Sequence, residues 1–291
     1  MALSDSLGVA RWLELPQGRI AYRERGEGPP VLFVHGLLVN ADLWRNVVPL
    51  VADAGHRCLA PDWPLGSHSH PMREQADLSP AALAALIADF LGALDLSGVT
   101  VVANDTGAAL VQVLMAMHPE RIGRVVLTSG DALDCFFPPM FAFLPAAARL
   151  PGSAWLLAQA LRPRLLHRLP MTYGWLSARP IPPQVMDSYL LPSRRDARIR
   201  RDLRRVLRGV HRRHTLAAAA SFGSFDRPVL LAWAEQDRLF PVSLARRLAG
   251  LLPDARLVTV AGSATFIPED QPAALAGLIV EFAGPVAAVH P

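Results

Sequence analysis

Runs of apolar, often β-branched residues alternate along the chain with segments whose apolar residues recur at helical spacing. The apolar runs predict strands over residues 12–15, 18–23, 30–36, 57–62, 99–103, 124–129, 227–234 and 255–262. The helical spacing predicts helices over residues 41–54, 79–94, 106–118, 241–251 and 271–282. Strands that alternate with helices are typical of a mostly parallel sheet covered on both faces. We therefore expect an α/β fold.

The alternation is interrupted between residues 135 and 214, which are rich in proline, aromatic residues and arginine. This stretch contains no strand-like run and indicates several short helices. We predict an α/β core formed by residues 1–134 and 215–291, with residues 135–214 inserted as a helical cap after the sixth strand. Within the cap, residues 193–214 concentrate positive charge, and their apolar residues recur at helical spacing. The pattern favours a surface helix with one buried stripe over a nucleic-acid or anionic-lipid site, since no aromatic residues interleave the arginines. The residues of that stripe are Ile199, Leu203, Val206, Leu207 and Val210.

Composition narrows the class of protein. The net charge of +4 comes entirely from arginine, because the chain contains no lysine, and genome composition explains this better than nucleic-acid binding. No apolar run reaches the length of a membrane span, and the first residues lack a signal-peptide pattern, so a cytoplasmic protein without a membrane partner is expected. Cys58 and Cys135 have no metal-type or disulfide spacing. No metal ligand cluster or phosphate-binding loop is visible, and we expect no cofactor.

The stretch VVANDTGAAL, residues 101–110, predicts a strand, a tight turn and a helix, with Asp105 in the turn. Three further landmarks follow the same order as in a known family: the HG turn at His35, WAEQDRLFP around Asp237, and PEDQP at the start of the last predicted helix. On these residues the chain resembles the α/β-hydrolase family over nearly its whole length. Its members with an aspartate nucleophile, the haloalkane dehalogenases and epoxide hydrolases, are the most similar.

This resemblance implies roles for individual residues. Asp105 would be the nucleophile, and backbone N–H groups of Thr106 and of Leu37 or Leu38 would form the oxyanion hole. Asp237 would be the acid that orients a histidine. Simpler alternatives are that Asp105 caps the helix after it and that Asp237 caps a loop or helix near residue 241. Two other aspartates after the sixth strand could replace Asp237 as the acid. They are Asp131 and Asp134.

One part of the family pattern is absent. The histidine base normally stands just before the last helix, and alignment on Phe266 and Pro268 places Thr265 there. A threonine cannot accept a proton near neutral pH, so an ester formed on Asp105 could persist. His68 is the better candidate for a relocated base, while His35 is expected to stabilise its own turn or to contact substrate. Dehalogenases also usually carry tryptophan where this chain has Thr106.

The cap sequence between residues 135 and 157 suits an apolar lid over a pocket for a small apolar molecule. A pair of cap tyrosines could donate hydrogen bonds to an epoxide, and two tryptophans could hold a halide, although packing roles are the simpler explanation. These four residues are Tyr173, Tyr189, Trp155 and Trp175.

The sequence leaves three functions open. The first is a hydrolase in which Asp105 attacks a halide, an epoxide or an activated ester. The second is a ligand-binding protein that has lost turnover. The third is a proton-transfer catalyst in which Asp105 acts as a general base with a raised pKa.

Overall fold

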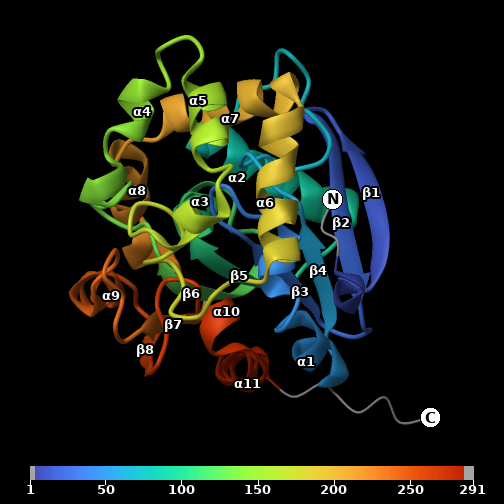
Figure 1. Ribbon diagram of the computed structural model, residues 1–291. Coiled ribbons are helices and arrows are strands. Elements are labelled where there is room, and N and C mark those ends of the chain that lie inside the picture. The colour runs from blue at the N-terminus through green and yellow to red at the C-terminus, as the bar shows by residue number, and fades with distance from the viewer. Residues whose placement is uncertain (1–3, 285–291) are drawn as a thin grey trace.

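The computed structural model describes residues 4–284, which contain one eight-stranded sheet (Figure 1). The strand order is β1-β2-β4-β3-β5-β6-β7-β8. The β1–β2 and β2–β4 pairs are antiparallel, and the remaining neighbours are parallel. The predicted mostly parallel sheet is therefore confirmed. The strands are β1 (Val9–Leu15), β2 (Gly18–Arg25), β3 (Pro30–Val34), β4 (Arg57–Pro61), β5 (Val99–Asp105), β6 (Ile122–Gly130), β7 (Val229–Ala234) and β8 (Ala255–Val260).

Helices cover both faces of the sheet. Those of the core are α1 (Val48–Asp53), α2 (Pro80–Ala93), α3 (Thr106–Met117), α9 (Val242–Ala249), α10 (Ile267–Asp270) and α11 (Pro272–Ala283). In β3, Leu32 and Val34 share an apolar cluster with residues of α2, α3 and α9, whereas Val31 and Phe33 share another with residues of α1 and α11. Because both faces of the inner strands β3 and β7 are buried, the sequences of these two strands are apolar throughout.

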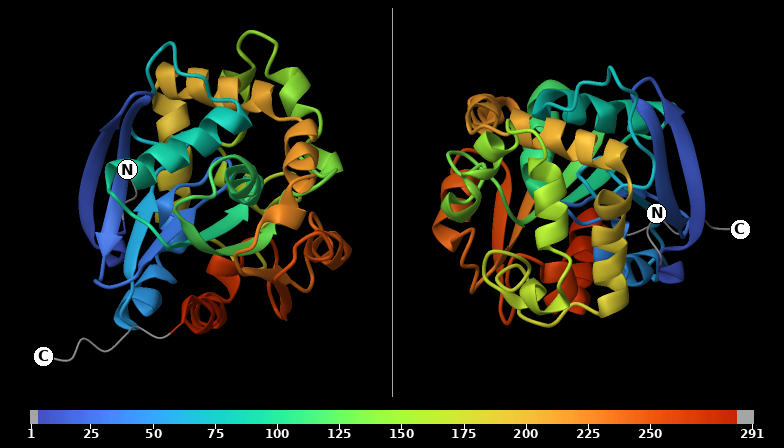
Figure 2. Two further views of the ribbon diagram at one scale, coloured as in Figure 1. Left: turned by 180° about the vertical axis from the view of Figure 1, so that it is seen from behind. Right: turned by 45° about the horizontal axis from the view of Figure 1, so that its top comes forward.

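The segment after β6 forms a helical layer, coloured yellow-green to orange, over one end of the sheet (Figures 1 and 2). Its helices are η3 (Pro139–Phe141), α4 (Leu144–Ala147), α5 (Ser153–Ala160), η4 (Arg164–Arg168), α6 (Pro183–Arg195), α7 (Ala197–Gly209) and α8 (Arg213–Ala219). The helical insertion after the sixth strand is thus confirmed. In α7 and directly after it, the five residues of the predicted apolar stripe are all buried. Helix α8 crosses the predicted cap boundary between residues 214 and 215.

Two local features explain how the first strands pair and where α2 begins. β1 and β2 form the opening hairpin, with Leu15 paired to Gly18. The Ser79 side chain caps α2 by accepting a hydrogen bond from the Ala82 amide, and proline occupies the first helical turn.

The continuous helix predicted over residues 41–54 is wrong. The structure has a short 3-10 helix, η2 (Ala41–Trp44), and then α1, which starts only at Val48. Pro49 lies in the first turn of α1. Its ring would clash with the carbonyl of residue 45 in an uninterrupted helix, and it has no N–H to donate, so the helix has to begin anew beside it.

Candidate functional site

Asp105 lies in the strained turn between β5 and α3. Its backbone has φ 55° and ψ −130°, and α3 begins at the next residue. The turn is crowded: a Cβ on Gly36 would lie 2.1 Å from the Asp105 Oδ2 atom, and a Cβ on Gly107 would lie 2.5 Å from the Val34 carbonyl oxygen. Glycine is therefore required at both positions. Asp105 occupies the N-cap position of α3, and its side chain makes no capping hydrogen bond of standard geometry.

The surroundings of Asp105 favour its protonated form more than water does. Burial raises the pKa of its carboxyl group, the backbone N–H groups of Thr106 and Leu37 lower it, and the negative charge of Asp237 raises it; together these effects move the pKa from 3.8 to about 7. The Leu38 amide donates instead to the Leu65 carbonyl oxygen at 3.0 Å. Of the two predicted candidates, Leu37 is thus the residue whose amide faces Asp105.

Asp237 and Thr265 lie in contact behind Asp105. The Thr265 hydroxyl donates to the Asp237 Oδ1 atom at 3.1 Å, and the amides of Leu239 and Phe240 donate to the same oxygen at 2.8 and 2.9 Å. Burial raises the pKa of Asp237. The Thr265 side chain is fully buried. A hydroxyl thus occupies the place beside the acid where the resemblance implies an imidazole.

Asp131, directly after β6, is a second buried carboxyl group near the site. Its backbone N–H donates to the Asp105 carbonyl oxygen at 3.3 Å. Its side chain is fully buried, and among residues 4–284 neither carboxyl oxygen has a partner at good hydrogen-bond geometry. Burial and the negative charge of Asp105 raise the pKa of Asp131 well above its usual value, and we expect it to retain a proton. Asp134, by contrast, pairs with Arg247 at the surface.

The two histidines considered from the sequence are held by other contacts. The His35 Nε2 atom accepts a hydrogen bond from the Trp63 amide at 2.9 Å, and burial lowers the His35 pKa to about 4. The His68 Nε2 atom lies 3.4 Å from an Asp202 carboxylate oxygen of α7. Neither ring lines the cavity beside Asp105. His35 therefore fixes its own turn, while His68 joins the core to the cap.

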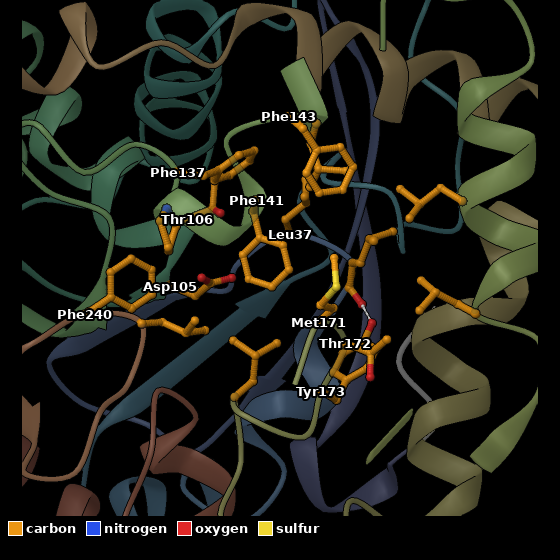
Figure 3. Close-up of a pocket in the computed structure, with 17 residues that line it drawn as sticks. Leu37, Asp105, Thr106, Phe137, Phe141, Phe143, Met171, Thr172, Tyr173 and Phe240 are labelled. Carbon is orange, nitrogen blue, oxygen red and sulfur yellow. Dashed lines mark hydrogen bonds between the residues drawn. The ribbon is translucent and has the colours of Figure 1, made fainter. Parts of the chain in front are cut away.

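A cavity of about 120 Å³ opens in front of Asp105, between the sheet and the cap (Figure 3). Its walls are almost wholly apolar, and the predicted lid segment supplies much of them. The lining residues are Leu37, Leu38, Asp105, Thr106, Phe137, Pro138, Phe141, Phe143, Leu144, Leu157, Leu161, Met171, Thr172, Tyr173, Leu176, Leu239 and Phe240. Leu239 and Phe240 are not among the site residues predicted from the sequence. Their positions two and three residues after Asp237 indicate that they lie near the site.

Of the four aromatic cap residues proposed to contact substrate, Tyr173 alone lines this cavity. Its hydroxyl donates to the Leu38 carbonyl oxygen at 2.7 Å. The Tyr189 hydroxyl donates to Glu269 at 3.3 Å, the Trp175 ring lies under the Arg238 guanidinium, and Trp155 is half exposed on the outer surface. These three side chains have packing or surface positions. Contacts between the cap helices determine which of these aromatic side chains line the cavity. Such contacts cannot be predicted from a single sequence.

Residues 4–284 contain no cluster of three or more His, Cys, Asp or Glu side chains suited to a metal ion. Both cysteines in this part of the chain are free thiols, and burial raises the pKa of Cys58 and of Cys135 to about 12. At the cavity, the structure places the Asp105 carboxyl group with the backbone amides of Thr106 and Leu37 facing it and Asp237 close enough to affect its pKa.

Comparisons with known proteins agree with this fold. The model of the "alpha/beta hydrolase fold" family matches residues 29–272. A protein named haloalkane dehalogenase 2 from Mycobacterium tuberculosis strain H37Rv is 25% identical over 280 residues, which cover 94% of each chain. The crystal structure of the haloalkane dehalogenase DatA from Agrobacterium tumefaciens C58 superposes with a TM-score of 0.76 at 22% identity, covering 96% of this chain and 98% of that one.

An alpha/beta hydrolase fold protein from Burkholderia ambifaria is similarly close in structure. It has a TM-score of 0.76 and 24% identity, and the match covers 93% of this chain and 97% of that chain. At this level of identity the solved structures establish the fold, while the family model spans most of the sequence, including β3, the Asp105 turn, β7 and Thr265. The chain belongs to the α/β-hydrolase fold family and is related to haloalkane dehalogenases.

Proposed function

We propose that Asp105 is a nucleophile that displaces a halide from a small apolar alkyl halide. A lone pair on an Asp105 carboxylate oxygen forms the new C–O bond, the C–X bond breaks, and the halide leaves with its electron pair. The product is an alkyl ester on Asp105. The observation that carries the proposal is the position of this carboxylate: it stands at the strained turn, faces two backbone amides and opens into an apolar cavity.

The lining of the cavity favours halides over epoxides. Opening an epoxide leaves an alkoxide that needs a hydrogen-bond donor, and the hydroxyls of Tyr173 and Tyr189 already donate to Leu38 and Glu269. Among the described lining residues, the Thr172 hydroxyl is also engaged, by the Leu166 carbonyl oxygen. With so few free donors for the leaving group, reactive bromides and iodides should work better than chlorides. Activated esters are the remaining alternative.

The second step, hydrolysis of the ester, should be slow. A water molecule needs a base to take its proton while it attacks the ester carbonyl carbon, and Thr265 cannot serve near neutral pH. Histidine is absent from the described residues that line the cavity. Once Asp105 is an ester, the backbone amides of Thr106 and Leu37 would stabilise the tetrahedral intermediate, but no base would activate the water. We expect the alkylated protein to accumulate.

Intact-protein mass spectrometry tests both steps. Incubation with 1-bromobutane should add one butyl group to the wild type and none to Asp105→Asn, with the adduct located on the peptide that contains Asp105. Failure of the wild type to gain mass, without release of bromide, would eliminate nucleophilic displacement. Release of bromide without a stable adduct would show that a base other than Thr265 completes turnover.

Thr265→His should convert accumulation into turnover. The Thr265 hydroxyl already contacts the Asp237 carboxylate, which is the partner an imidazole there would need. We expect the alkyl-enzyme of this variant to lose its adduct at least about tenfold faster than the wild-type adduct, because general base catalysis contributes about 10²–10⁴-fold when well placed. Thr265→Asn, which has similar bulk and no basic nitrogen, is the control. Equal rates for the two variants would contradict the proposed reason for a slow second step.

One observation favours a second function, proton transfer by Asp105. A carboxyl group with a pKa of about 7 in an apolar cavity is suited to act as a general base near neutral pH. In that case the wild type would catalyse exchange of an activated C–H proton with deuterated water, observed by NMR, and would gain no mass from alkyl halides. Loss of exchange in Asp105→Asn would assign the proton transfer to this residue.

A further inference from the structure

Charge is divided unevenly between the cap and the core. Residues 135–214 contain fifteen arginines and three aspartates, a net charge of +12, whereas the rest of the chain carries −8. The arginines of residues 193–214 do not account for all of the cap's positive charge. Three more, Arg164, Arg168 and Arg179, line a pocket on the outside of the cap. Arg164 pairs with Asp187 at 3.0 Å. The cap therefore presents a strongly cationic surface on an otherwise acidic molecule.

The same layer exposes an unusual number of large apolar side chains. Seven lie between residues 143 and 171, from 47% exposed at Leu169 to 83% exposed at Leu165. Scattered exposed apolar residues are ordinary, whereas neighbouring ones form interaction surfaces, and Phe143, Leu150 and Leu156 line one groove. We call these seven side chains the apolar cap residues. They are Phe143, Leu150, Trp155, Leu156, Leu165, Leu169 and Met171.

The apolar cap residues and the arginines flank the catalytic cavity. Phe143, Leu144 and Leu157 line both the cavity and an outer groove that also contains Leu150 and Leu156. On another side, Tyr173 lines both the cavity and the pocket that contains the three arginines. The cap thus brings apolar groups, positive charge and the wall of the cavity together on one layer of the molecule.

We propose that this cap surface docks on membranes that contain anionic lipids. Lipid phosphate and carboxylate groups match the arginines, and the apolar cap residues can enter the boundary between headgroups and acyl chains. No helix in residues 4–284 can span a bilayer, and surface docking needs none. A second copy of the chain fits less well, because two caps that each have a net charge of +12 would face and repel each other. A nucleic acid would match the arginines but would leave the exposed leucines without a partner.

Docking of this kind would place the cavity wall against the bilayer. Apolar molecules concentrate in the hydrocarbon region of a membrane, so a site that contacts this region would receive them without passage through water. The proposal is independent of the chemistry at Asp105, since it rests on the charge and exposure of cap residues, most of which lie outside the cavity.

Co-sedimentation with lipid vesicles tests the surface directly. The wild type should bind vesicles of phosphatidylcholine with about 30% phosphatidylserine at least about tenfold more tightly than vesicles of phosphatidylcholine alone. The difference should vanish in about 1 M sodium chloride, where the Debye length is about 3 Å. Absence of binding to the anionic vesicles at low salt would overturn the proposal.

Two cap variants and a matched pair of control variants separate the contributions. Leu150→Ser/Leu156→Ser/Leu165→Ser and Arg164→Gln/Arg168→Gln/Arg179→Gln should each weaken binding to anionic vesicles by about tenfold or more. The control is a matched pair of core variants, Val9→Ser/Trp12→Ser/Leu251→Ser and Arg19→Gln/Arg73→Gln/Arg246→Gln, which replace the same number of exposed apolar and arginine side chains and should bind like the wild type. A control that weakens binding as much as the cap variants would overturn the proposal, because net charge alone would then explain the interaction.

Two further measurements test the competing occupants. Binding to double-stranded DNA that is as tight as binding to anionic vesicles, and that is unchanged by the three leucine substitutions, would assign the surface to nucleic acid and overturn the proposal. A dimer in sedimentation velocity that the leucine substitutions abolish would assign it to a second copy and overturn it as well. A wild type that stays monomeric and prefers vesicles supports membrane docking.

Discussion

The Asp105 carboxyl group is held where ionisation is costly. Its burial and the nearby charge of Asp237 favour the protonated form, and two backbone amides recover part of the cost. Asp131, fully buried beside it, also has a raised pKa, because of its own burial and the negative charge of Asp105. A nucleophile must be ionised, and alkylation of Asp105 should therefore speed up as the pH rises through about 7.

The same raised pKa predicts how stability depends on pH. The carboxyl group of Asp105 has a pKa of about 7 in the folded protein and an ordinary value of 3.8, so the folded state binds the proton more tightly. Stability from this proton is complete below about pH 4 and is lost as the pH rises through about 7. In Asp105→Asn no such loss occurs. Its free energy of unfolding, relative to the wild type, should increase by about 2–4 kcal/mol between about pH 4 and pH 8 in urea titrations.

Asp134→Asn provides a control of opposite sign. A hydrogen bond from Arg247 lowers the pKa of Asp134, so this carboxylate stabilises the folded state above its ordinary pKa. The variant should lose stability as the pH rises, and by less than about 1 kcal/mol because both partners are half exposed. If Asp105→Asn follows the pH profile of the wild type in parallel, the raised pKa of Asp105 is refuted.

At the scale of elements, one buried carboxylate joins α7 to the core. Asp202 is fully buried and accepts hydrogen bonds from the Met72 amide at 2.8 Å and from the Arg201 guanidinium at 2.9 and 3.0 Å, and it lies 3.4 Å from His68. The segment at residues 66–72 thereby fixes the arginine-rich helix above the sheet. His68, considered from the sequence as a catalytic base, belongs to this connection.

Removal of this connection should loosen the cap. Asp202→Ala leaves the Met72 amide, His68 and Arg201 without their shared acceptor, and loss of one partner from a buried charged network costs about 3 kcal/mol or more. Asp187→Ala removes an aspartate from the exposed pair with Arg164 and should cost about 0–1 kcal/mol. Urea unfolding followed by circular dichroism compares them. Equal losses for both variants would mean that Asp202 does not anchor the cap.

The elements were predictable to different degrees, for physical reasons. The inner strands can be predicted because both of their faces are buried and their sequences are therefore mainly apolar. The start of α2 can be predicted because Ser79 is a favoured N-cap residue and a proline follows it. The Asp105 turn was identified by its place between a strand and a helix. Asp237 and Thr265 could be located by their order along the chain. The pairing of His68 with Asp202 could not be predicted, because it depends on which side of α7 packs over the segment at residues 66–72, 134 residues away.

At the scale of the whole molecule, the cavity exists only because the two layers meet. The core supplies the charged end through Asp105, and the cap supplies most of the apolar wall. The sequence predicted the lid segment as a whole, but it did not indicate which aromatic side chains point inward: Phe137, Phe141 and Phe143 line the cavity, whereas Trp155 faces outward. Packing among the short cap helices determines which aromatic side chains point inward. The boundaries of these helices depend on proline and glycine rather than on apolar residues that recur at helical spacing.

The small volume of the cavity predicts selection by size. Its volume of about 120 Å³ is somewhat below that of a cavity which accommodates benzene, about 150 Å³, so we expect 1-bromobutane to fit better than 1-bromooctane. We expect the first to alkylate Asp105 at least about tenfold faster, since one methylene in a tight apolar pocket changes discrimination by about tenfold or more. Leu157 separates the cavity from the outer groove. Leu157→Ala should therefore reduce the ratio of the 1-bromobutane rate to the 1-bromooctane rate by about tenfold. Both rates are measured as mass gain of the protein in the absence of lipid vesicles.

Leu156→Ala is the matched control for this wall. Leu156 is the neighbouring residue on α5 and lines the groove, but it is exposed and does not line the cavity. Its replacement should leave the ratio of the two alkylation rates as in the wild type. If both variants changed the ratio equally, the groove rather than the cavity wall would set the size limit. An unchanged ratio in Leu157→Ala would place the limit deeper, at the aromatic side chains around Asp105, and Phe141→Ala would then be the substitution that admits the longer chain.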